Sequence, residues 1–127
     1  AAKLQIKDFL PLLEKNSLKL MPQKDNKANI WRKRNESDGK IDWRMAAENI
    51  HNLIRSLSKP YPGAYFIHNE QKYIVLKSKV VSIKEKNLEP GKIIRKKNKT
   101  PLVVCGDNSL KLIKVEPEIN LSKLNYL

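Results

Sequence analysis

A change in hydrophobic period near residue 63 restricts the fold more than any other feature of the sequence. Beyond the Pro62-Gly63 pair, Val, Ile and Tyr gather in short runs that turn residues separate. Short strands at close spacing are typical of a small barrel or sandwich. The predicted strands are Ala64 to His68, Lys72 to Ile83, Lys92 to Arg95, Leu102 to Cys105 and Leu110 to Val115.

Turn residues support this assignment. The segment from His68 to Gln71 bridges the first two predicted strands, and the segment from Cys105 to Ser109 joins the last two as a hairpin. Beyond the Glu116-Pro117 pair, residues 118–127 are predicted to be a tail.

A helix is predicted just before the strands, over residues 43–57. Its apolar positions recur every three or four residues, and Asp42 is placed to cap its first turn. Pro60 and the Pro62-Gly63 pair end it. The resulting apolar stripe must pack on another element, and it consists of Trp43, Ala47, Ile50, Ile54 and Leu57.

The first forty residues are predicted to hold the end of an amphipathic helix and a polar linker. Leu4, Phe9, Leu12 and Leu13 share roughly one helical face, so the chain reads as cut from something longer. Pro11 is expected to kink this helix or to mark its first turn. In the linker, the stretch from Trp31 to Arg34 is either a solvated arm or a docking point for a neighbouring domain or a phosphate.

The length and composition indicate one folded domain. The chain has 127 residues, of which 40% are hydrophobic, and no apolar run approaches the roughly 18 residues that cross a bilayer. No signal peptide is visible, so we expect a cytoplasmic protein without membrane association. The single cysteine, Cys105, excludes an internal disulfide and is predicted to be buried in a strand.

The net charge is +13, from 26 Lys and Arg against 13 Asp and Glu. Such an excess favours polyanions such as tRNA, a nucleotide or an anionic surface. It also fits the lysine-rich composition of proteins from AT-rich genomes, and both interpretations stay open. The candidate polyanion-binding residues are Arg32, Lys33, Arg34, Lys77, Lys79, Arg95, Lys96, Lys97, Lys99 and Lys111.

The sequence shows no group of residues with the types and spacing of a catalytic site. His51 and His68 have no Cys or carboxylate at a metal-ligand spacing, and we interpret both as structural. No glycine-rich phosphate loop and no nucleophile-elbow motif occurs. We therefore predict no catalytic, cofactor-binding or metal-binding residue, and no enzyme activity in these residues by themselves.

Several segments together resemble one known family, the 10-formyltetrahydrofolate-dependent formyltransferases. The stretch from Asp38 to Trp43, followed by Ala47 to Ile50, Asn52 to Arg55 and Pro60 to Ala64, is similar to the joint between that family's two domains. Two later stretches, Pro90 to Ile94 and Val104 to Leu110, resemble its carboxy-terminal barrel. The similarity covers nearly the whole chain.

The resemblance implies an α+β, mainly β fold with a five- to six-stranded open barrel similar to an OB fold. Residues 1–40 would be the end of the catalytic domain's last helix plus the linker, residues 41–117 the carboxy-terminal domain with its barrel at 64–116, and 118–127 the tail. It also implies an upstream Rossmann-like domain that binds 10-formyltetrahydrofolate through an Asn, His and Asp set. None of that set matches residues here, so no cofactor is expected on them.

The predicted acceptor is methionyl-tRNA, and the amino-sugar branch of the family is the alternative. In methionyl-tRNA formyltransferases, which act in protein biosynthesis, the barrel helps to hold initiator tRNA, and the charge of +13 favours this branch. The basic stretch after Trp31, and Tyr61 before Pro62, look closer to the amino-sugar N-formyltransferases, where the module is structural. A free-standing nucleic-acid-binding barrel is the alternative from another class.

Five residues are predicted to be structural anchors: Asp42, Trp43, Arg55, Pro62 and Gly63. Trp43 is expected to be buried at the domain joint, where replacement by Ala would cost about 3 to 5 kcal/mol. Arg55 is expected to pair with a carboxylate or a carbonyl.

Overall fold

A computed structural model of the chain describes residues 2–95 and 100–127. The chain forms two compact units, Ala1–Lys33 and Arg34–Leu127. The second unit therefore begins before the boundary predicted at residue 40. All the strands of the described residues belong to the second unit.

The first unit contains α1 (Ala2–Glu14) and a single 3-10 turn at Asp25–Lys27. The predicted amphipathic helix is confirmed, but Pro11 lies inside it rather than in its first turn. No residue of α1 is buried, and Leu4, Phe9 and Leu13 are between 42% and 67% exposed. The apolar stripe of this helix therefore has no partner among the described residues.

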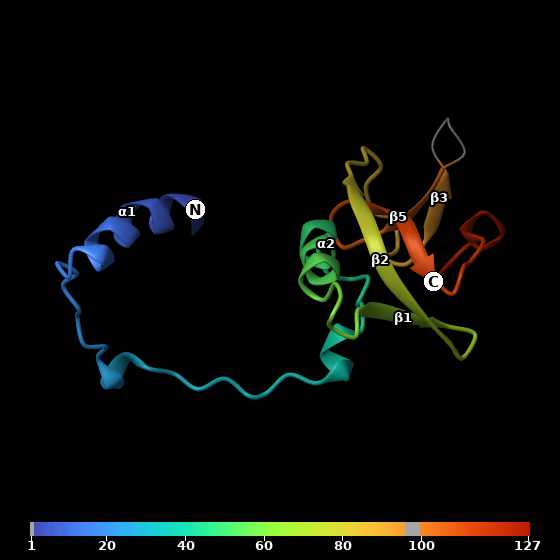
Figure 1. The fold of residues 1–127 in the computed structure, drawn as a ribbon. Helices are drawn as coiled ribbons and strands as arrows, with labels where there is room; N and C mark the ends of the chain where they lie inside the picture. Colours follow the sequence, from blue (N-terminus) through green and yellow to red (C-terminus); the bar gives the residue numbers. More distant parts are fainter. Residues whose placement is uncertain (1, 96–99) are drawn as a thin grey trace. The chain divides into compact units, whose positions relative to one another are not determined.

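The second unit is built on one five-stranded antiparallel sheet in the order β1-β2-β5-β4-β3 (Figure 1). This arrangement confirms the predicted α+β, mainly β class. The predicted runs differ from the observed strands by only a few residues at their ends. The strands are β1 (Ala64–His68), β2 (Gln71–Val81), β3 (Ile93–Arg95), β4 (Pro101–Val104) and β5 (Ser109–Glu116).

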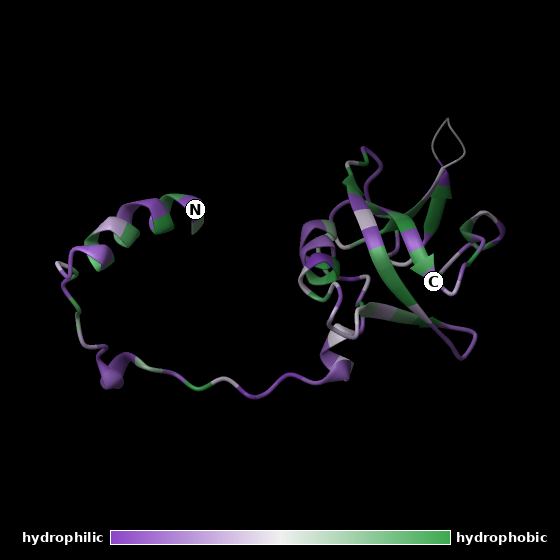
Figure 2. Ribbon diagram, viewed as in Figure 1, coloured by the Kyte–Doolittle hydropathy of each residue, from purple (hydrophilic) through white to green (hydrophobic). Residues whose placement is uncertain are grey.

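The helix α2 (Ala47–Ser56) covers one face of the sheet, against β2 and β5. Its buried side chains, Ile50 and Ile54, join Val75 and Leu110 of the strands in the main hydrophobic core. Phe66 adds a stacked contact with Tyr73 at 5.3 Å between ring centroids. Figure 2 shows green hydrophobic segments along the strands, interrupted by purple hydrophilic ones, and a purple turn between β1 and β2.

The start of α2 corrects two sequence predictions. The helix begins at Ala47 and not at Trp43, which lies in the turn before it. Asp42 does not cap it, because the Asp42 carboxylate accepts hydrogen bonds from Arg44 instead. The side chain that does reach the helix start comes from the loop between β4 and β5: Asp107 accepts a hydrogen bond from the Ala47 N–H.

The prediction that residues 118–127 form a tail is wrong. Leu121, in a 3-10 turn at Leu121–Lys123, is 6% exposed and packs in a second cluster with Ile93 and Val103. The Ile93 N–H donates to the Asn125 carbonyl at 2.7 Å. The carboxy-terminal segment therefore covers the outer edge of β3, which would otherwise expose unpaired backbone groups.

Candidate functional site

Four lysines face one another across the central strands β2 and β5. The register places Lys77 opposite Lys114 and Lys79 opposite Lys111, with an irregularity at Lys77. In the regular pair of Lys79 and Lys111, directly opposite side chains lie about 5 Å apart at their Cβ atoms, and like charges there are destabilising. We call Lys77, Lys79, Lys111 and Lys114 the lysine strip.

Most of this charge is left uncompensated. Among the described residues, Lys77, Lys79 and Lys111 have no carboxylate within 4.0 Å, while Lys114 lies 3.4 Å from Glu116. Lys72 of the same strand differs, because it pairs with Glu36 and its Nζ lies 4.2 Å from the centroid of the Tyr65 ring. The strip is therefore a concentration of cations that an external anion would stabilise.

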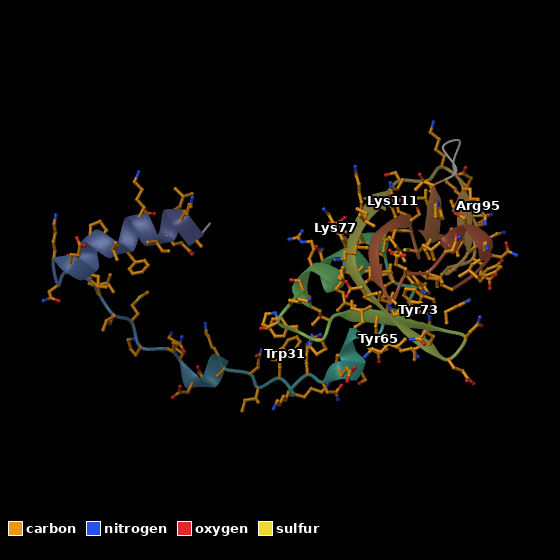
Figure 3. The ribbon with its side chains drawn as sticks, turned by 45° about the vertical axis from the view of Figure 1, so that its right-hand side comes forward. Trp31, Tyr65, Tyr73, Lys77, Arg95 and Lys111 are labelled. Carbon is orange, nitrogen blue, oxygen red and sulfur yellow. The ribbon has the colours of Figure 1, made fainter. Side chains whose placement is uncertain are left out.

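The pair formed by Lys79 and Lys111 lies on the sheet face turned away from α2. The neighbouring pair, Val80 and Leu110, belongs to the opposite face, since successive residues of a strand alternate. Leu110 is fully buried in the core with α2. Figure 3 labels Lys77, Lys111 and Arg95, which come from β2, β5 and β3 respectively.

A groove of about 930 Å³ lies beside the lysine strip, and Lys111 belongs to both. The loop between β2 and β3 forms one wall, and Val81 of β2, Thr100 and residues of β3, β4 and β5 contribute the rest. This groove was not predicted from the sequence, in which Ile83 and Leu88 enclose the polar stretch from Lys84 to Asn87. The lining residues are Val81, Ser82, Ile83, Lys84, Glu85, Leu88, Lys92, Ile94, Arg95, Thr100, Leu102 and Lys111.

The other predicted cations come from three further parts of the chain. Arg32 and Lys33 belong to the first unit, and Arg34 begins the second. Lys96, Lys97 and Lys99 lie outside the described residues. Arg95 does line the groove, and its guanidinium also donates to the carbonyls of Ser122 and Leu124, which ties it to the carboxy-terminal segment.

Two predicted anchors lie in the turn before α2. Trp43 is half-buried rather than buried, and it contacts both hydrophobic clusters, with its ring 5.7 Å from that of Phe66. Asp42 is held by Arg44 at 2.7 Å, and hydrogen bonds from that guanidinium lower the pKa of the carboxyl to about 2. Both residues therefore have contacts that shape the turn.

The remaining anchors flank the helix at its other end. Arg55 is exposed in the last turn of α2, and no side-chain hydrogen bond or ion pair involves it within the described part of the chain. Pro62 is exposed as well. Gly63 is buried with φ of +92°, and a Cβ there would lie 2.5 Å from Ile74 Cγ2, so glycine is required at this position.

The two histidines and the cysteine lie among residues that explain them structurally. His51 Nδ1 lies 2.9 Å from Ser78 Oγ, His68 ends β1, and burial raises the pKa of the Cys105 thiol to about 12. The described residues hold no group of three or more His, Cys, Asp or Glu side chains that could bind a metal. In the described ranges, no helix has the length and apolar character to span a bilayer.

Comparison with known proteins gives one family and one fold. Residues 33–122 match the family described as formyl transferase, C-terminal domain. Two solved structures of substituted variants of HypX from Aquifex aeolicus share the fold. The first has 17% identity and a TM-score of 0.51 over 83% of this chain and 18% of HypX. The second has 15% identity and a TM-score of 0.55 over 93% of this chain and 22% of HypX. The chain thus spans about a fifth of the HypX length.

Proposed function

The chain belongs to the formyl transferase C-terminal domain family, and we propose that it is the tRNA-binding module of a methionyl-tRNA formyltransferase. In this proposal an amino-terminal catalytic domain binds 10-formyltetrahydrofolate and transfers its formyl group to the amine of methionyl-tRNA. The module described here contributes affinity for the tRNA backbone and no reacting group.

The observation that carries the proposal is the lysine strip. Lys79 lies directly opposite Lys111, where like charges are unfavourable, and three of the four ammonium groups of the strip have no carboxylate partner in the described residues. A nucleic-acid backbone supplies the missing negative charges at regular spacing, and each phosphate bound releases condensed counterions. The net charge of +13 acts in the same direction by attracting a polyanion at long range.

The test is binding of initiator tRNA over a salt series, with an unrelated tRNA alongside. Phosphate contacts carry no sequence information, so we expect both tRNAs to bind the module with similar affinity. Replacing Lys79 and Lys111 together by Gln should weaken binding and reduce the slope of log K against log salt by about 1 for each lost contact.

The matched control is the double replacement of Lys59 and Lys123 by Gln, which removes the same charge away from β2 and β5. An equal loss in the control would show that only net charge matters. Absence of tRNA binding near physiological salt would overturn the proposal and favour the amino-sugar branch, in which the module is structural.

A further inference from the structure

The groove beside the lysine strip combines an apolar floor with a cationic rim. Leu102 is 3% exposed, and the other aliphatic lining residues, Val81, Ile83, Leu88 and Ile94, are half-buried. Around them stand four cations, Lys84, Lys92, Arg95 and Lys111, against the one carboxylate of Glu85. A ligand that fits this surface has an apolar body and negative charge close to it.

The groove and the strip form a continuous surface. Lys111 lines the groove and is paired with Lys79 across the strands, and Val81 of the groove is the next residue on the same face of β2. A ligand held by the strip would therefore extend into the groove without crossing an edge of the sheet.

We propose that the groove accepts an unpaired nucleotide of the RNA that the lysine strip holds, an inference that rests on the proposed function. A base has two apolar faces and is attached to anionic phosphates, and this matches the aliphatic floor and the cationic rim. Ser82 and Thr100 are the uncharged polar residues among those lining the groove. Because so few polar groups can hydrogen-bond to base edges, we expect the groove to discriminate little between the four bases.

The experiment compares two RNA duplexes of the same sequence, one blunt and one with a short single-stranded overhang that carries a fluorescent adenine analogue. We expect the overhang to tighten binding by about tenfold, equivalent to about 1.4 kcal/mol. The fluorescence of the analogue should change on binding, because the base leaves water for an apolar surface.

Groove variants test the location. Leu88→Glu, in the loop, and Ile94→Glu, in β3, should each abolish the tenfold preference for the overhang while binding of the blunt duplex stays at the level of the control. The control is Ile67→Glu, which adds the same charge on β1, outside the groove, at a side chain that is 48% exposed. Thermal melts of all three variants show whether each one folds.

The results separate the two proposals. Equal binding of both duplexes would overturn the nucleotide site and leave the strip intact as a phosphate-binding surface. Failure of both duplexes to bind would overturn the proposed function and this inference together. A labelled acidic amphipathic peptide that binds the chain, loses binding in Leu88→Glu and fails to compete with the overhang would assign the groove to a protein partner and refute the nucleotide site.

Discussion

The carboxylate of Asp107 accepts a hydrogen bond from the backbone N–H of Ala47, at 2.8 Å and across 60 residues of sequence. The adjacent Gly106 N–H donates to the Met45 carbonyl at 2.9 Å. A Cβ at Gly106 would lie 2.2 Å from the Arg44 carbonyl oxygen, so only glycine allows this approach. The loop between β4 and β5 therefore caps α2 and joins the helix to the sheet.

Replacing Asp107 by Ala should lower the free energy of unfolding by about 1 kcal/mol, since the first turn of α2 would lose its acceptor. Asp107→Asn keeps an acceptor and should cost less. Urea denaturation measures both. The comparison variant is Asp42→Ala, which removes an exposed pair with Arg44 and should have the smaller effect. The reverse order would show that Asp42 is the cap after all.

Trp43→Ala should cost about 2 to 3 kcal/mol, below the 3 to 5 kcal/mol typical of a fully buried tryptophan. The side chain is half-buried, but it contacts both hydrophobic clusters and lies beside Gly91. Thermal and urea unfolding measure the loss of stability in Trp43→Ala. Trp31→Ala, at a residue that is 76% exposed, controls for the chemical change. A melt identical to the parent chain would remove Trp43 from the packing described here.

Leu121→Ala should destabilise the second unit by about 2 kcal/mol or more, because a buried side chain between Ile93 and Val103 would be truncated. The same change at Leu20, which is 84% exposed, should have almost no effect. Hydrogen exchange should show faster exchange at the Ile93 amide in Leu121→Ala, because the Asn125 carbonyl would hold it less firmly. Unchanged stability would restore the interpretation of residues 118–127 as a tail.

Cys105 should resist alkylation in the folded chain. Burial raises the pKa of its thiol to about 12, against an ordinary value of 9.0, so the thiolate that reacts is scarce below that range. The unfolded thiol ionises near its ordinary pKa while the folded thiol keeps its proton. The contribution of this group to stability is therefore complete below about pH 9 and falls as the pH rises toward 12. Alkylation followed with urea should track unfolding, and rapid labelling without urea would contradict the buried site.

Much of the fold is readable from local patterns. The switch to Val-rich and Ile-rich runs after Gly63, and the turns between them, locate all five strands of the described chain. The apolar stripe that contains Ile50 and Ile54 predicts α2 and its packing against strands. The resemblance to formyltransferases comes from the same local segments, and the match of residues 33–122 to the formyl transferase C-terminal domain family confirms it.

The errors occur where a residue's partner is distant in the sequence. Asp42 stands at the position that a cap requires, yet Arg44 binds it and Asp107 caps the helix from the far hairpin. Residues 118–127 lack strand periodicity, and their burial depends on the exposed edge of β3, which no local pattern reports. Charge density along the chain predicts candidate cations, but it does not reveal which of them are neighbours in the fold.

Hydrophobic period and turn residues act over a few neighbouring positions, so the primary structure alone specifies the helices and the strands, and it also fixes the net charge of +13. Strand register is a property of two segments at once. Only the pairing of β2 with β5 brings Lys79 opposite Lys111, and only the return of the loop between β2 and β3 across the sheet places Leu88 and Lys111 on one groove. The surface that combines the lysine strip and the groove therefore follows from tertiary contacts between segments that carry no sequence signal of each other.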